Sequence, residues 1–499
     1  MRQRPSGGNP QATARRGAIA IATALAVAVS ACGGSDDAAT GSAEQSCPIG
    51  ALDTADGRVE VTIWHNYASL SGKILDEQIA AFNASQKRVK VVGQFQGSTF
   101  EELQSKVEEA AVDKELPGLV TLEDTKTRWA ADSGLFSSAQ ACIDSDPEVK
   151  AQFDDLLPIV KSSYEMNGTL YPVSFGVFTA LVYYNQTHFE AAGLDPSVAP
   201  ATIDEMEKDA RAIKAALPDV KPIVMTTAPW VFEWWMSGIR QELVNKGNGR
   251  DGVATTSELA SEPAVKLLEQ LQRMKREGLI DVVAGTPGQV DHMLAMAQQQ
   301  SSIVVESSSA ATTVAGVIEG TIDAERLKDE LKVELPAGFD TRQLGLKVEA
   351  GPIPGIKTSG KGQVGGAVWY LPNTNSRTVQ AGAWEFVQFL NRPENQAEWT
   401  IRGSNAPAFR ATVDEPALQT AFTSSLGGRW QKAAYDVLES GVDSSFPGPI
   451  IGPYTEMRTS LRKALDSALL DDKDARESLE KADAEVNAEL KLYAQDIGG

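Results

Sequence analysis

The heptapeptide PWVFEWW, Pro229 to Trp235, gathers aromatic side chains around one carboxylate. Trp230, Trp234 and Trp235 are three of the nine tryptophans in a chain of 499 residues. Flat rings cover the apolar C–H faces of a polar solute, and a carboxylate accepts hydrogen bonds from its hydroxyl groups. In a helix, residues four apart share one face. We therefore expect Trp230, and beside it Trp234, to line a binding cleft, while at least one of Trp234 and Trp235 packs in the core.

Polar residues also end two predicted strands. His65 and Asn66 follow the strand RVEVTIWH, and Glu123 ends the strand PGLVTLE. Ligands of open α/β sheets bind at the carboxyl ends of the strands, so these three residues are candidate ligand contacts. The alternative is that they only cap turns.

Four more candidates lie in two later segments. Ser307 and Ser308 belong to the run ESSSA, and Tyr454 and Arg458 belong to GPYTEMR. Serine hydroxyls donate hydrogen bonds, a tyrosine ring stacks, and arginine binds a phosphate or carboxylate through two bonds. The alternatives are a serine-rich turn and a surface salt bridge of the arginine.

Patterns typical of enzymes are largely missing. The three histidines are isolated, and the sequence has no HExxH, CxxC or G-x-S-x-G motif. The segment GIKTSGKG resembles a phosphate-binding loop, but glycine stands where serine or threonine must reach the metal. We expect no catalytic residue, no metal site and no cofactor. A glycosidase-like pair of carboxylates stays open, because separation along the sequence does not fix separation in space.

The charge of the chain argues against some partners. The formal net charge is −21, with 42% hydrophobic and 23% charged residues. This balance is that of a globular protein long enough for two or three cores. So acidic a chain repels nucleic acid, and no run of Lys and Arg compensates.

The N-terminal residues have the pattern of an export signal. An acid-free start with four arginines precedes the apolar run Ala18 to Ala31, which is too short to span a bilayer. The tripeptide VSA before Cys32 resembles the lipobox of bacterial lipoproteins. This resemblance implies cleavage after residue 31, a diacylated Cys32 and a flexible tether over residues 32–57. The alternative is an ordinary cleaved signal.

Two cysteines remain in the exported chain, Cys47 and Cys142. The extracytoplasmic compartment permits disulfides, and a bridge between them would fix the end of the tether to the first lobe. The alternative is two free thiols.

The apolar periodicity predicts an α/β protein. Strands over residues 58–65, 88–95 and 117–123 start about thirty residues apart, which is typical of βαβ units with a parallel sheet. A turn at Asn167-Gly168 precedes an extended run over residues 170–185. Thr202 and Glu205 have the spacing of a capping box.

Several segments together resemble a known family. They are VTIWH, LPGLVTLED, LYPVSFGVFTALVYYN with FEAAGLDP, WEFVQFLNRPENQAEW and SNAPAF, in this order. They resemble the substrate-binding lipoproteins of ATP-binding-cassette (ABC) importers, in the carbohydrate group that includes maltose-binding and glycerol-3-phosphate-binding proteins. The resemblance covers nearly all of residues 58–490. It implies two α/β lobes with a hinge and a ligand cleft between them. Lobe 1 is expected over residues 58–171 and 366–404, and lobe 2 over 174–362 and 408–499.

The glycerol-3-phosphate binders are similar in PWVFEWW…NGRDG, ESSSA, GGAVW and GPYTEMR. This likeness implies ligand contacts at five positions, which are Glu123, Trp230, Ser307, Gly366 and Arg458. Phe100 stands where those proteins place a tyrosine, and Gly176 to Phe178 replace a serine-containing loop. These departures weaken the case for phosphate, so a sugar or a glycerophosphodiester stays open.

The resemblance implies a monomeric receptor, lipid-anchored on the outer face of the cytoplasmic membrane. It would close on an oligosaccharide, glycerol-3-phosphate or a glycerophosphodiester and deliver it to the permease subunits without chemical change. Two alternatives remain. One is a secreted carbohydrate-active hydrolase or an esterase, and the other is a structural or adhesive lipoprotein.

Overall fold

The computed structural model describes residues 47–97, 99–285, 291–322 and 346–498. The predicted signal peptide, Cys32 and residues 33–46 of the predicted tether lie outside the described residues. In the described part of the chain, no helix has both the length and the apolar character that crossing a bilayer requires.

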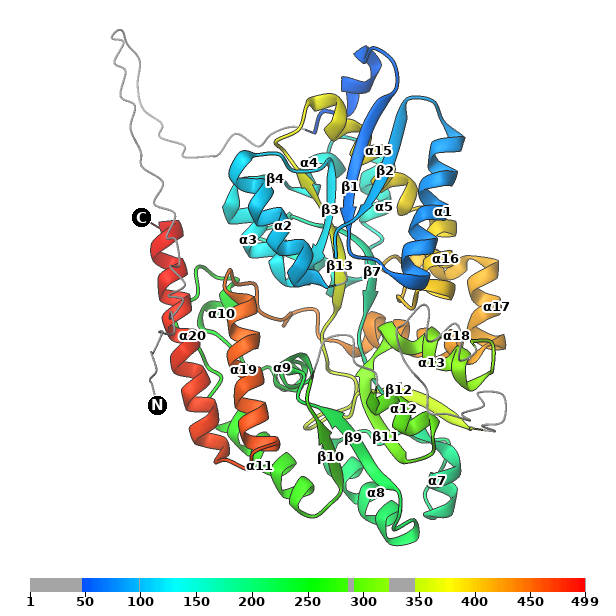
Figure 1. The fold of residues 1–499 in the computed structure, drawn as a ribbon, viewed down its shortest axis with the longest axis vertical. Coiled ribbons are helices and arrows are strands. Elements are labelled where there is room, and N and C mark those ends of the chain that lie inside the picture. Colours follow the sequence, from blue (N-terminus) through cyan, green and yellow to red (C-terminus); the bar gives the residue numbers. More distant parts are fainter. Residues whose placement is uncertain (1–46, 98, 286–290, 323–345, 499) are drawn as a thin grey trace, which may run out of the picture. The chain divides into compact units, whose positions relative to one another are not determined.

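The first of two large sheets mixes parallel and antiparallel strands (Figure 1). In spatial order its strands are β2 (Val89–Phe95), β1 (Val59–His65), β3 (Leu119–Glu123), β13 (Gly365–Pro372) and β4 (Phe136–Ser137), and β7 (Val173–Phe178) also pairs with β13. β1 is parallel to β2 and β3, as the βαβ spacing predicts. β13 is antiparallel to β3, β4 and β7. The parallel arrangement predicted for the first three strands is therefore confirmed, and β13 adds an antiparallel strand because it returns from the second sheet in the opposite direction.

The second sheet has five strands. In spatial order they are β10 (Ile280–Val283), β9 (Lys221–Thr226), β11 (Ser301–Ser307), β8 (Ala180–Asn185) and β12 (Val348–Pro352). β9 is parallel to β10 and β11, while β8 is antiparallel to β11 and β12. The carboxyl ends of β9 and β11 lead into the residues Thr226 and Ser307, which line the cavity described below.

Helices surround both sheets (Figure 1). Before β7 the chain forms α1 (Ser69–Ser85), α2 (Phe100–Asp113), α3 (Thr127–Ser133), α4 (Ala139–Ile143), α5 (Pro147–Phe153) and α6 (Pro158–Tyr164). Between β8 and β12 it forms α7 (Gln186–Ala191), α8 (Ile203–Ala216), α9 (Pro229–Gly238), α10 (Asn245–Gly249), α11 (Glu262–Arg276), α12 (Asp291–Ala297) and α13 (Ala311–Ile318). After β13 come α15 (Arg377–Leu390), α16 (Pro393–Gly403), α17 (Pro416–Ser424), α18 (Leu426–Asp436), α19 (Tyr454–Leu469) and α20 (Ala475–Gly498). Short turns of helix are η1 (Ile49–Thr54), η2 (Asp124–Lys126), η3 (Ser308–Ala310), η5 (Arg410–Asp414) and η6 (Val437–Gly441), and β5 (Glu165–Met166) pairs with β6 (Thr169–Leu170).

Local sequence signals explain several of these boundaries. The predicted turn at Asn167-Gly168 joins β5 to β6, with positive φ angles of 52° and 79° that asparagine and glycine tolerate best. α8 begins after Thr202, whose side chain accepts a hydrogen bond from the Glu205 N–H, as predicted. The second half of the predicted capping box is wrong, because Glu205 accepts its bond from the Ala201 N–H instead.

The chain passes between the two sheets more than once. The extended run over residues 170–185 is not one strand, because it divides at Thr179 into β7 of the first sheet and β8 of the second. A second passage connects β12 to β13, and after α16 the chain returns to α18, which packs against β12 and α13. The predicted limits of the lobes stay a prediction. β7, which follows the predicted end of lobe 1 at residue 171, pairs with β13 of the first sheet.

Part of the predicted tether is folded. Cys47 forms a disulfide with Cys142 across 95 residues of sequence. η1 follows, packs against α15 and buries Leu52. The residues just after Cys47 are therefore fixed to the half of the molecule that is built on the first sheet.

Replacing both Cys47 and Cys142 with serine should lower the free energy of unfolding by about 4 kcal/mol, because the bridge closes a long loop in the unfolded chain. Urea unfolding measures this loss. Dithiothreitol should lower the midpoint of the wild type and leave that of the double variant unchanged. An unaffected wild type would contradict the stabilising role of the bridge.

Candidate functional site

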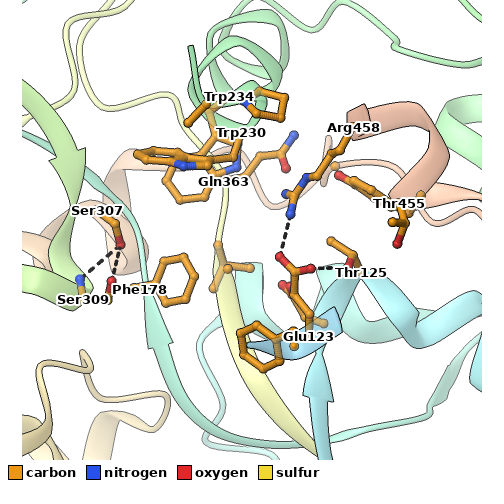
Figure 2. A pocket seen from close by; sticks show the side chains of 18 of the residues that line it. Glu123, Thr125, Phe178, Trp230, Trp234, Ser307, Ser309, Gln363, Thr455 and Arg458 are labelled. Carbon is orange, nitrogen blue, oxygen red and sulfur yellow. Dashed lines mark hydrogen bonds and ion pairs between the residues drawn. The ribbon is translucent and has the colours of Figure 1, made fainter. Parts of the chain in front are cut away.

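A cavity of about 890 Å³ is lined by residues of both halves of the molecule. From the first half come Asn66, Phe100 and the segment Glu123 to Thr125, which follow strands β1 and β3 or begin α2. From the second half come residues of α9, the end of β11 and one face of α19. Figure 2 shows Trp230 and Trp234 near Phe178, and Arg458 facing Glu123.

The structure brings most of the predicted site residues together. Eight line the cavity, and they are Asn66, Phe100, Glu123, Trp230, Trp234, Ser307, Tyr454 and Arg458. His65, Ser308 and Gly366 are not among its lining residues. That the eight bind a ligand remains a proposal.

The three other candidates lie just behind the cavity wall. His65 is buried between the rings of Tyr67 and Phe95. Ser308 is fully buried, and its hydroxyl accepts a hydrogen bond from the Thr179 N–H. A Cβ atom at Gly366 would lie 2.8 Å from the Gly176 carbonyl oxygen, so glycine is required there by the close approach of β7.

The aromatic wall of the cavity is built on α9. Trp230 and Trp234 are one turn apart, and their rings meet edge to face with centroids 5.0 Å apart. The Phe178 ring lies 6.5 Å from that of Trp234. Trp235 points away from the cavity, is 2% exposed and donates a hydrogen bond to the Pro354 carbonyl. Trp230 and Trp234 thus line the cavity, although Trp234 is as buried as Trp235, and a role of either in ligand binding stays a prediction.

Arg458, on α19, joins two carboxylates, one of which lies on the helix of the aromatic wall. Its Nε and Nη2 atoms donate to both oxygens of Glu233, at 2.9 and 3.1 Å, and Nη1 donates to Glu123 at 2.5 Å. The Glu233 side chain is 0% exposed and also accepts a bond from the Tyr454 hydroxyl. Burial alone would lower the pKa of Arg458, but the charges of Glu233 and Glu123 outweigh it and raise that pKa. The guanidinium is thus held by protein carboxylates.

Asp124, next to Glu123, carries a proton at neutral pH. Burial, followed by the charge of Glu123, raises the pKa of Asp124 to about 8, against the opposing effect of Arg458. A protonated carboxyl donates a hydrogen bond as well as accepting one. Asp124 lines the cavity beside Glu123.

Arg250 was not predicted from the sequence. It connects the two halves of the molecule by donating hydrogen bonds to backbone carbonyl oxygens of both. Its guanidinium donates to the carbonyl oxygens of Ser162, Ser163 and Glu165 in the first half and of Gly448 in the second. Burial lowers its pKa to about 10, so it stays charged. Its place in the motif NGRDG could have marked it as a candidate. Its partners could not be predicted, because every residue has a backbone carbonyl and such acceptors are not specified by residue type.

Two polar groups of the cavity wall, Ser307 and Glu306, bond to neighbouring protein side chains. The Ser307 hydroxyl donates to that of Ser309 rather than to a histidine. The His292 ring bonds to Glu306 through Nε2 and makes no hydrogen bond to the Ser307 hydroxyl. Among the described residues, no three His, Cys, Asp or Glu side chains are grouped as metal ligands.

The model of one protein family, described as bacterial extracellular solute-binding protein, matches residues 77–423. The chain belongs to this family. It is exported and captures a small solute for an ABC importer. The family match favours this function over the hydrolase alternative.

Individual relatives agree with the family match. The sn-glycerol-3-phosphate-binding periplasmic protein UgpB of Escherichia coli strain K12 is 22% identical over 450 residues, which are 89% of this chain and 95% of that protein. The sugar-binding protein MalE of Xanthomonas citri superposes with a TM-score of 0.67, at 19% identity, over 87% of this chain and 98% of that one. UgpB of Mycobacterium tuberculosis in complex with glycerophosphocholine gives a TM-score of 0.64, at 16% identity, over 89% and 99%. These structures share the two-lobe fold of the solute-binding protein described here.

Replacing Arg458 with methionine should destabilise this solute-binding protein by roughly 3 kcal/mol, because it leaves the buried Glu233 without its cation. Replacing Glu233 with glutamine in addition should recover much of the loss. Urea unfolding of the wild type, the single variant and the double variant measures both effects. A double variant no more stable than the single one would contradict the ion pair as the cause.

Asp124→Asn should make stability less dependent on pH. The unfolded carboxyl ionises near its ordinary pKa of 3.8, whereas the native one keeps its proton up to about pH 8. The unfolded state therefore binds fewer protons in this window, and the stability of the wild type falls as pH rises through it. The melting temperature of the variant minus that of the wild type should increase from pH 4 to pH 8 and should not change further above pH 8. Asp219→Asn, at an exposed carboxylate, is the control. A difference that does not vary with pH would contradict the raised pKa.

Proposed function

We propose that this protein is a lipid-anchored, monomeric receptor that closes on one small polyhydroxylated solute and releases it chemically unchanged to the permease subunits. The observation that carries the proposal is the cavity of about 890 Å³, because both halves of the molecule supply its aromatic and polar walls. A pocket of this size encloses a disaccharide-sized or smaller solute. A sugar and a glycerol-3-phosphate-type solute both fit the chemistry of this lining.

Hinge closure is supported by the passages of the chain between the sheets and by side-chain contacts between the two halves. Arg458 of α19 reaches Glu123 at the end of β3. Lys126 donates to the Thr455 hydroxyl at 2.5 Å, and the Tyr493 hydroxyl donates to Asp132 at 2.6 Å. Such contacts exist only when the two halves approach, so a solute that adds further contacts from both halves favours the closed form.

The lining suits a solute with one apolar face and several polar edges. The cavity lining includes three aromatic rings, those of Trp230, Trp234 and Phe178. Such rings pack against the C–H groups of a sugar or of a glycerol chain. Asn66, Asp124 and Ser307 present donors and acceptors to the edges. The relatives bind either sugars or glycerol phosphates, according to their names, so both classes belong in the first binding panel.

Anchoring through Cys32 rests on the sequence alone. The lipobox-like VSA and the polar residues after Cys32 support acylation there. Mass spectrometry of the N-terminal peptide from membranes would detect the two acyl chains and the thioether-linked glyceride. An unmodified N-terminus would contradict the anchor and leave solute binding unaffected.

Binding should be visible as thermal stabilisation. A ligand at 100 times its dissociation constant adds about 2.7 kcal/mol to the stability of the native state. A panel of maltose, trehalose, sn-glycerol 3-phosphate and glycerophosphocholine should include at least one solute that raises the melting temperature. Trp230→Ala should abolish that rise, because it removes half of the edge-to-face pair.

The matched control is Trp64→Ala, because Trp64 is also half-buried but lies outside the cavity lining. This variant should keep the full response of the wild type. Retained binding in Trp230→Ala, or a solute recovered in altered chemical form, would contradict the proposed function.

A further inference from the structure

Arg462 occupies one face of α19 together with the proposed ligand residues. Thr455, Arg458, Thr459 and Arg462 follow each other at spacings of three, one and three, and all four line the cavity. Residues at these spacings share a side of a helix. Arg462 therefore reaches the cavity one turn beyond Arg458, on the same side of the helix.

The guanidinium of Arg462 has no partner among the described residues. It makes no hydrogen bond and no ion pair there, and its Nε atom is buried without an acceptor. The arginine side chain is a cation with five N–H donors and no acceptor. The Nε–H of Arg462 is withdrawn from water without an acceptor, which is costly, so this half-buried guanidinium at the cavity wall is suited to a ligand anion.

The other cations of the cavity wall differ from Arg462. Arg458 donates three bonds to the carboxylates of Glu233 and Glu123 and is neutralised by them. Arg250 donates its bonds to backbone carbonyls that bind the two halves together. A solute anion would have to displace these protein partners, whereas Arg462 offers its donors directly.

No acid of the cavity wall, Asp124 included, forms an ion pair with Arg462 in the described part of the chain. Glu123 pairs with Arg458, and Glu306 bonds to His292 and to the Ser307 N–H. Glu101 is exposed on α2, in the other half of the molecule. The acid nearest in sequence on the same side of α19, Asp466, accepts a bond from the Thr227 hydroxyl. The positive charge of Arg462 is therefore available to the cavity.

We infer that Arg462, with the Thr459 hydroxyl beside it, is the specificity-determining residue that binds an anionic group of the solute, a phosphate or a carboxylate. The aromatic wall then takes the carbon skeleton, and Arg458 serves to position Glu233 and Glu123. The inference rests on the proposed function and narrows it to solutes that carry an anion. The inference also assigns anion binding to Arg462 rather than to Arg458, the ligand contact that the sequence resemblance implied.

Isothermal titration calorimetry of the purified protein tests this with four probes. They are sn-glycerol 3-phosphate, glycerophosphocholine, D-glycerate and maltose, which represent a phosphate monoester, a phosphate diester, a carboxylate and a neutral solute. The wild type should bind at least one anionic probe. Arg462→Gln should weaken that probe at least tenfold, because a charge-assisted pair of bonds is lost. Arg462→Lys should recover part of the loss, since the charge remains and the paired geometry does not.

The matched control is Lys463→Gln. Lys463 is the next residue on α19 and carries the same charge, but it is exposed and pairs with Glu485 outside the cavity lining. This variant should bind the anionic probe within twofold of the wild type. Equal loss in both variants would show a general charge effect and overturn the inference. Melting temperatures without ligand show that each variant is folded.

Two outcomes separate this inference from the proposed function. If the wild type binds maltose and no anionic probe, or if Arg462→Gln binds the anion as well as the wild type does, the inference is wrong and the receptor function stands. If no solute of the wider panel binds, the proposed function fails and the inference fails with it.

Discussion

The buried carboxylate of Glu233 is the constraint on which the cleft depends. Its side chain is 0% exposed, and an unpaired carboxylate in that position would be too costly to keep ionised. Arg458 and the Tyr454 hydroxyl satisfy it from α19. Because Glu233 lies on α9 between Trp230 and Trp234, this pairing also fixes the rotation of the helix that carries the aromatic wall.

The same guanidinium connects the two halves of the molecule. Its third bond reaches Glu123, which ends β3 of the first sheet. A single arginine thus links the orientation of the aromatic wall to the distance between the halves. When the halves separate, the bond to Glu123 breaks while the two bonds to Glu233 remain within the second half. This partly exposed ion pair is one of the contacts that opening breaks, together with the Lys126–Thr455 and Tyr493–Asp132 hydrogen bonds.

The sequence predicts those parts of this structure that depend on neighbours along the chain. Alternation in RVEVTIWH yields β1, with Val61 and Ile63 fully buried, and the Asn167-Gly168 pair yields the predicted turn. The sequence does not reveal that residues 170–185 divide between two sheets at Thr179, because both strands there are buried and read as one apolar run. The antiparallel course of β13 depends equally on contacts that form only in the folded chain.

The candidate site shows the same limit at the level of single side chains. Because Arg458 is an arginine in the motif GPYTEMR, the sequence suggests that it binds an anion of the ligand. Its actual partners are the carboxylates of Glu233 and Glu123, which are 225 and 335 residues away in sequence. No local pattern records that they neutralise it. Arg462 belongs to no recognisable motif. It differs from Arg458 and Arg250 in that its Nε atom has no acceptor in the described part of the chain, and this difference exists only in the folded chain. The chemistry of an arginine in a cleft is therefore set less by its sequence context than by the acids that pair with it in the fold, and among the described residues no acid forms an ion pair with Arg462.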